Sequence, residues 1–190
     1  YCQCGGCDFQ HIAPGAQLRI KEEIIAESMR RAGISISPAL LRPILPSPAV
    51  YHYRRRLRLK LSPGGSVGFF KPKSNDLTAV NRCPVATAKL NNALLELSRS
   101  SLLRETAALV REIDLLHSPA DDRIFARLSP RPGKTIAPSL MAGLADSLHT
   151  VDGIGAHGDD GRQQGLLRQD FEADLAGRSF SLTWTPGCFS

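Results

Sequence analysis

The chain has 190 residues, of which 24 are Lys or Arg and 18 are Asp or Glu, so its formal net charge is +6 and its isoelectric point is near 9.3. This length supports one good hydrophobic core, and a basic balance of this kind favours an anionic partner, nucleic acid before a membrane surface. No uninterrupted apolar run of about 18 residues occurs, which predicts that no helix spans a membrane.

The cysteines cluster at the start of the chain. Three of the five lie in the first seven residues, Cys2, Cys4 and Cys7. An odd number grouped in this way is not typical of a disulfide framework, so we expect a reducing, cytoplasmic setting. Residue 1 is Tyr1, with no initiator methionine or signal peptide before the cysteines. We therefore expect a fragment of a larger multidomain protein.

The segment CGGC at residues 4–7 has the spacing of a metal-binding turn, because its two glycines leave both thiols free to face one metal centre. Cys83, which is followed by Pro84, is a third thiol of the kind that an iron-sulfur cluster uses. We predict Cys4, Cys7 and Cys83 as metal ligands. The alternative, in which the amino-terminal cysteines are idle thiols near a flexible end, stays open.

Residues 16–32 follow as a predicted helix, because Leu18, Ile25 and Met29 recur at helical spacing. We expect this apolar stripe to pack into the core. Four prolines make residues 36–50 a connector without regular structure. The predicted organisation is a cluster-binding loop and helix at 1–35, the Pro-rich connector at 36–50, and a central domain at 51–190.

Residues 51–61 alternate apolar and basic side chains, which predicts a strand with one buried face and one cationic face. No acidic residue occurs between residues 51 and 75, and this favours a phosphate-binding surface over an ordinary solvated face of mixed charge. The cations predicted to contact the phosphates of a nucleic acid are Arg54, Arg55, Arg56, Arg58, Lys60, Lys71 and Lys73.

The remaining patterns predict an α+β fold, a two-layer domain with a mainly antiparallel sheet and two or three helices. The further strands are expected at 67–70, 77–80, 110–117, 123–128, 164–175 and 178–184, the last two as a hairpin. The further helical segments are expected at 86–97, 102–109 and 138–148.

One glycine motif does not predict a dinucleotide-binding site. Residues 153–158 match GxGxxG, but a dinucleotide site needs a following helix, and Asp159, Asp160 and Gly161 follow instead. We interpret the segment as a glycine-rich loop. The five histidines share no spacing with an acid or a nucleophile, so we predict no catalytic and no cofactor-binding residue in this chain.

Taken together, the motifs resemble those of the bacterial RNA (uracil-5-)-methyltransferases. The resemblance covers residues 1–85, and residues 180–190 are similar to the start of that family's S-adenosylmethionine domain. The segments that carry it are CGGCDFQHI at 4–12, AQL at 16–18 with Lys21, YRRR at 53–56, GF at 68–69 and CPV at 83–85.

The resemblance implies a 4Fe-4S cluster held by four cysteines, with Cys4, Cys7 and Cys83 as the second, third and fourth ligands. The first would precede Tyr1, unless Cys2 takes its place. It also implies a parent enzyme that methylates uracil C5 in ribosomal or transfer RNA. S-adenosylmethionine and the catalytic groups would belong to a carboxy-terminal domain in cis. We therefore expect this chain to be the iron-sulfur and RNA-binding domain, inactive by itself.

Two alternatives from other classes remain. The first is a stand-alone nucleic-acid-binding module stabilised by zinc on Cys2, Cys4, Cys7 and Cys83. The second is an electron-transfer iron-sulfur protein. Absorbance at about 400 nm separates iron-sulfur clusters from zinc.

Overall fold

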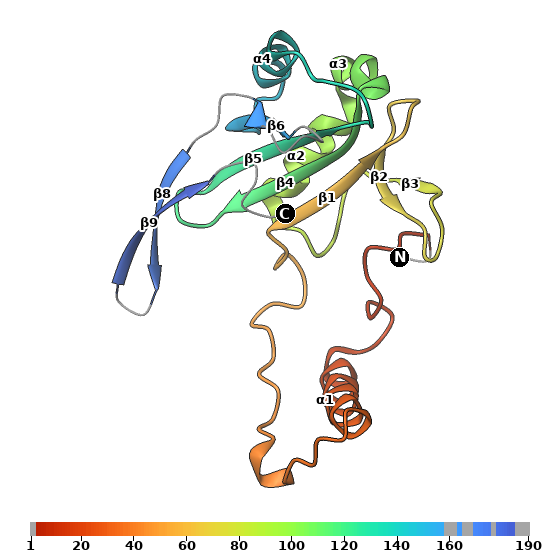
Figure 1. The fold of residues 1–190 in the computed structure, drawn as a ribbon, viewed down its shortest axis with the longest axis vertical. Helices are drawn as coiled ribbons and strands as arrows, with labels where there is room; N and C mark the ends of the chain where they lie inside the picture. The colour runs from red at the N-terminus through yellow and green to blue at the C-terminus, as the bar shows by residue number, and fades with distance from the viewer. Residues whose placement is uncertain (1–2, 158–162, 165–168, 176–177, 185–190) are drawn as a thin grey trace.

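The molecule, a computed structural model, combines one mixed sheet with α-helices and an extended amino-terminal arm (Figure 1). The structure describes residues 3–157, 163–164, 169–175 and 178–184. Its strands are β1 Arg56–Leu61, β2 Val67–Phe70, β3 Leu77–Ala79, β4 Val110–Ser118, β5 Arg123–Pro130, β6 Gly153–His157, β7 Gln163–Gln164, β8 Gln169–Leu175 and β9 Arg178–Trp184. Its helices are α1 Pro14–Arg31, α2 Ala88–Arg99, α3 Ser101–Glu105 and α4 Pro138–Ser147, with short 3-10 helices η1 Pro38–Leu40 and η2 Thr106–Ala108.

Seven strands form the main sheet in the order β3-β2-β1-β4-β5-β6-β7. All neighbours pair antiparallel except β5 and β6, which are parallel. The α+β prediction with a mainly antiparallel sheet is confirmed. Residues 101–105 form the short helix α3, at the helical segment expected for residues 102–109.

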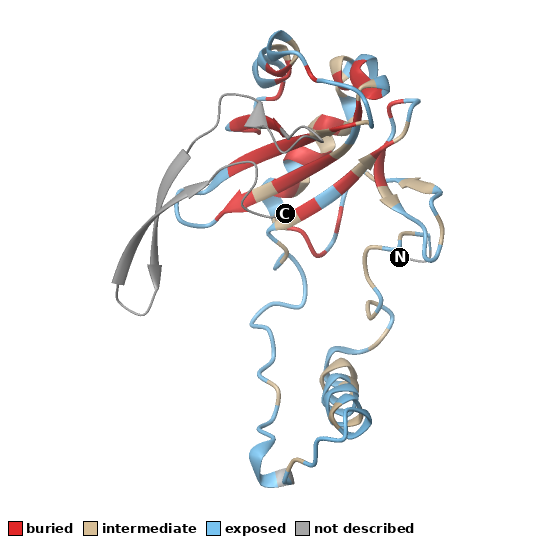
Figure 2. Cartoon of the chain, viewed as in Figure 1, coloured by how far each residue is buried: buried red, intermediate tan, exposed pale blue. Residues whose placement is uncertain are grey.

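The core lies between the sheet and its helices (Figure 2). Leu57, Leu59 and Leu61 of β1 are buried, while the residues between them turn to the other face of the sheet. The helix α2 buries Leu90, Leu94 and Leu97 as its spacing predicts. These two faces give the expected layers of sheet and helices.

A glycine allows the close approach of β2 and β3. Gly68 lies opposite Ala79 in the ladder. A Cβ atom at Gly68 would lie 1.9 Å from the carbonyl oxygen of Thr78, so no larger residue fits this register. The predicted strands at 67–70 and 77–80 are thereby confirmed as a closely packed edge of the sheet.

Two predictions for the amino-terminal half are wrong. The strand begins at Arg56 rather than at residue 51, and Tyr51 and Tyr53 are half exposed, at 51% and 49%. The helix α1 exists, but it buries none of its residues, and Ile25 remains 45% exposed. Its apolar stripe is not buried in the core because the arm extends away from the sheet (Figures 1 and 2).

A third correction concerns residues 153–157, which we interpreted as part of a glycine-rich loop. They form β6, whose Ile154 and Ala156 are buried against the core. The hairpin prediction near the carboxyl end is confirmed, since β8 and β9 pair antiparallel. Within the described part of the chain, no helix has the length and apolar character needed to cross a bilayer.

Candidate metal centre and nucleic-acid interface

The cysteine loop is fixed to the β2–β3 hairpin at the end where residues 71–76 connect the two strands. The backbone N–H of Gly5 donates to the carbonyl oxygen of Phe70 at 2.9 Å, and the Thr78 hydroxyl donates to the carbonyl oxygen of Gln3 at 3.0 Å. A Cβ at Gly5 would lie 2.6 Å from that same Phe70 oxygen, so this position requires glycine. The loop carries Cys4 and Cys7, both partly exposed.

Cys83 is buried in the turn that follows β3. The amide side chain of Asn91 on α2 holds this turn from both sides. Its oxygen accepts from the Cys83 N–H at 2.7 Å, and its nitrogen donates to the Cys83 carbonyl at 3.0 Å. Asn91 is a positioning residue that the sequence reading missed, and a polar residue inside the predicted buried stripe of residues 86–97 was its only signal.

The three thiols are electrostatic neighbours. Burial raises the pKa of the Cys7 thiol, and the proximity of Cys83 and Cys4 raises that pKa further, while the Arg54 guanidinium opposes the shift. An Arg54 nitrogen lies 4.0 Å from the Cys7 sulfur and donates to the Gly6 carbonyl at 3.1 Å. The chain therefore brings thiols from two distant segments into one neighbourhood.

The donor chemistry of this neighbourhood suits a cluster, because thiolates are the ligands of iron-sulfur centres. Among the described residues, which exclude Cys2, no three Cys, His, Asp or Glu side chains are grouped closely enough to hold a metal ion as they stand. The ligand assignment for Cys4, Cys7 and Cys83 thus stays a prediction. What supports it is that Cys4 and Cys83 are near enough to the Cys7 thiol to influence its pKa.

The cationic face of β1 meets carboxylates from β4. Asp114 accepts two hydrogen bonds from Arg56, at 2.8 and 2.5 Å, and a third from Arg127 at 2.6 Å. Glu112 pairs with Lys60, and its carboxylate lies 3.3 Å from the Arg58 guanidinium. The stretch without acidic residues therefore receives its counter-charges from a strand more than 35 residues further along the chain.

The pairing leaves an excess of positive charge. Among the described residues, four cations share this face with two carboxylates, and these six side chains have a net charge of +2; the cations are Arg56, Arg58, Lys60 and Arg127. The side chain of Arg58 remains 53% exposed, whereas that of Arg127 is 9% exposed. Arg58 is therefore accessible to a phosphate, whereas Arg127 is buried and pairs with Asp114 inside the domain.

The other predicted cations lie around this face. Arg55 is exposed just before β1, and its side chain has no ion pair within the described residues. Lys71 forms a loose exposed pair with Asp76 at 3.8 Å. Lys73 is exposed in the loop between β2 and β3, with a left-handed φ of 54°. Contact between these cations and RNA remains a prediction.

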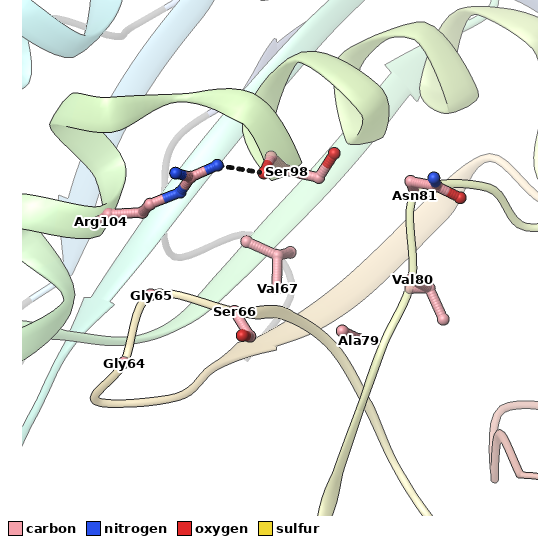
Figure 3. Close-up of a pocket in the computed structure, with 9 residues that line it drawn as sticks. All are labelled: Gly64, Gly65, Ser66, Val67, Ala79, Val80, Asn81, Ser98 and Arg104. Carbon is pink, nitrogen blue, oxygen red and sulfur yellow. Dashed lines mark hydrogen bonds between the residues drawn. The ribbon is translucent and has the colours of Figure 1, made fainter.

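A separate hollow of about 560 Å³ lies beside the turn that joins β1 to β2 (Figure 3). Arg104 and Ser98 form one side of it, with the Arg104 guanidinium donating to the Ser98 carbonyl at 3.4 Å. Gly64 and Gly65 form another side. The lining contains no aromatic side chain, so this hollow offers no stacking surface for a base.

No family model matches the chain. Individual proteins do match it. An uncharacterized RNA methyltransferase of Thermosynechococcus vestitus is 29% identical over 144 residues, which cover 74% of this chain and 31% of the relative. The 23S rRNA (uracil(1939)-C(5))-methyltransferase RlmD of Dechloromonas aromatica is 30% identical over 141 residues, covering 64% of this chain and 32% of the relative.

A second RlmD, from Photorhabdus laumondii, is 36% identical over 102 residues, which cover 50% of this chain and 22% of the relative. The chain thus spans about a third or less of the length of these curated relatives. Among solved structures, the Pyrococcus abyssi tRNA (uracil-54, C5)-methyltransferase in complex with S-adenosyl-L-homocysteine has the same fold, with a TM-score of 0.64 at 16% identity. That match covers 99% of this chain and 47% of the other.

Proposed function

We propose that this chain, a member of the RNA (uracil-5-)-methyltransferase family, forms the iron-sulfur and RNA-binding part of an enzyme that methylates C5 of uracil. The observation that carries the proposal is the sequence match over 144 residues, which covers 74% of this chain. The names of the relatives and of the similar solved structure support ribosomal or transfer RNA as the substrate class.

In this proposal the chain holds the RNA by its phosphates. Lysine and arginine side chains on a rigid sheet bind phosphate without reading sequence, and they fix the orientation of the bound RNA. Arg55, just before β1, and Arg58, on β1, are the best placed because both are exposed. Arg56 and Lys60 contribute mainly to the positive electrostatic potential of this face, since each is already paired with a carboxylate.

Cys4, Cys7 and Cys83 would hold the cluster, with a fourth thiolate from Cys2 or from a residue outside this sequence. The cluster would supply a structural tie between the amino-terminal loop and the turn after β3. Asn91 keeps the Cys83 backbone in place for that contact. Arg54 lies near the Cys7 sulfur and offsets the negative charge of the thiolates.

The chemical step is assigned to the parent enzyme rather than to this chain. S-adenosylmethionine would be bound, and the uracil attacked, by groups of a carboxy-terminal methyltransferase domain in cis. We therefore expect the chain alone to bind RNA and to transfer no methyl group. Its task is to keep folded RNA in place while the target base is turned out of its stack.

The salt dependence of RNA binding tests this function. Replacing Arg55 and Arg58 by Ala in the full chain removes two exposed phosphate contacts. The slope of log affinity against log salt, measured with a tRNA or rRNA fragment between about 50 and 200 mM salt, should become shallower by about 2.

The matched control removes the same charge from the helix layer, with Arg99→Ala on α2 and Arg104→Ala on α3. This control should leave the slope within experimental error of the wild-type value. If the two double variants shift the slope equally, the basic strand is not the RNA-binding surface, and the proposal fails.

A further inference from the structure

A cavity of about 390 Å³ lies between the cysteine loop, the first turns of α1 and the segment that leads into β1. Its volume falls in the range of sites that hold one small ligand, about 300–1,000 Å³. Three aromatic side chains line it, those of Phe9, Tyr51 and Tyr53. Two cations, Lys21 and Arg54, line it as well, against a single carboxylate from Asp8. This combination differs from the polar hollow of Figure 3.

The two tyrosines are held in place by the backbone between them. The His52 N–H donates to the Pro84 carbonyl at 3.1 Å, and the Arg54 N–H donates to the Val85 carbonyl at 2.7 Å. The His52 ring adds a bond to the Ala86 carbonyl at 3.0 Å. The segment is therefore fixed to the turn after Cys83, and its aromatic side chains need little reordering to bind a ligand.

Both tyrosines keep about half of their surface exposed, at 51% for Tyr51 and 49% for Tyr53. A tyrosine ring with about half of its surface open to solvent offers a flat surface on which a base can stack. Cations at the same wall suit the phosphate that accompanies each base. The lining thus has the two features that single-stranded RNA requires.

We propose that this cavity takes one nucleobase of single-stranded RNA, stacked on Tyr51 or Tyr53, with its phosphate toward Lys21 and Arg54. This inference rests on the proposed RNA-binding function, which it deepens by a site that does not depend on the cationic face of β1. It predicts that part of the binding energy comes from the base itself rather than from the phosphate chain.

The test uses the full chain with two fluorescent probes, an oligouridine and an abasic ribose-phosphate chain of the same length. The double variant Tyr51→Ala and Tyr53→Ala should weaken oligouridine binding by about 5- to 150-fold, the range typical of one stacked base. It should leave the abasic probe unaffected. The double variant with Phe at both positions keeps the rings and should bind like wild type.

Photo-crosslinking with 5-iodouridine in the oligouridine adds a direct readout, and the modified peptide should contain Tyr51 or Tyr53. Leu45→Ala, on an exposed residue of the same connector, should change neither probe. Equal binding of both probes by wild type, with no effect of the Ala variants, overturns the base site and leaves the RNA-binding function standing. Failure of wild type to bind the oligouridine also overturns the base site, whereas the RNA-binding function is overturned only if the chain fails to bind the tRNA or rRNA fragment as well. Equal weakening of both probes in the Ala variants, without rescue by Phe, also overturns stacking.

Discussion

At the scale of single residues, Asp114 explains how a cationic strand can lie inside a folded domain. Its carboxylate is 7% exposed and receives hydrogen bonds from Arg56 on β1 and Arg127 on β5. Removing two charges from water is costly, and the cost is met only when each charge has well-placed partners. Asp114 therefore joins three neighbouring strands at one point of the sheet.

Replacing Asp114 by Asn should lower the free energy of unfolding by about 3–5 kcal/mol, because the buried Arg127 then loses its ion pair with the Asp114 carboxylate. Urea unfolding followed by circular dichroism measures this change. Asp146→Asn on the exposed part of α4 is the control and should shift stability by no more than about 0.5 kcal/mol. A stability of Asp114→Asn equal to that of the control would show that the ion pairs contribute nothing.

At the scale of elements, Glu96 ties α2 to the segment that follows α4. Its carboxylate accepts from the His149 N–H at 2.8 Å and from the Thr150 N–H at 2.9 Å, and the Thr150 hydroxyl adds a third bond. Burial alone would raise the pKa of Glu96, but these hydrogen bonds outweigh it and hold the pKa below the ordinary value. The ionised form is therefore the one that the fold stabilises.

This lowered pKa predicts that the contribution of Glu96 to the stability of the fold depends on pH. A carboxyl whose pKa is lower in the folded state contributes its stability above the ordinary pKa, about 4.3 for glutamate, and loses it as the pH falls through that value and the lower folded one. Glu96→Gln should therefore be less stable than wild type near neutral pH by about 1 kcal/mol or less, since the group is partly exposed to solvent. The difference should shrink as the solution is acidified.

Thermal unfolding from about pH 7 to pH 3 measures this difference. The charge-matched control is Glu105→Gln on α3, whose carboxylate is exposed and makes no hydrogen bond within the part of the chain that the structure describes. A wild-type advantage over Glu96→Gln that persists unchanged at the acid end would contradict the assignment.

At the scale of the whole molecule, the three cysteines lie where the amino-terminal arm meets the sheet. Gly5 and Gln3 already bond to the β2–β3 edge, while α1 beyond them has no buried residue. A cluster on Cys4, Cys7 and Cys83 would add a covalent tie at this junction. It would fix the arm, and with it the wall of the cavity that contains Tyr51 and Tyr53.

Metal loading tests this tie. Anaerobic reconstitution with iron and sulfide should produce broad absorbance at about 400 nm. Cys83→Ser should lose it, while Cys188→Ser, which alters a cysteine outside the described residues, should keep it. A colourless protein that binds zinc through the same cysteines would favour the zinc-stabilised module instead.

Patterns within one segment were predictable from the sequence. The alternation in residues 56–61, the leucine spacing of α2 and the paired strands β4 and β5 all appear in the structure as expected. The cysteine motif and the basic strand likewise pointed to the family that the relatives support. Each of these signals depends on side chains close in sequence, whose periodicity follows directly from the geometry of a helix or a strand.

Other features were decided only by tertiary contacts. The carboxylates of Glu112 and Asp114 reach β1 because β4 pairs beside it, and no pattern within residues 51–75 indicates that pairing. Residues 153–157 form a strand because β5 offers them a parallel neighbour, although three glycines in residues 153–158 favour a loop. In α1 the local pattern was sufficient for the helix but not for its packing, because the periodicity of the apolar stripe specifies a helix and not the surface that would cover it. Local sequence determines which backbone geometry a segment prefers, whereas the groups that meet across the fold depend on segments far apart in the chain.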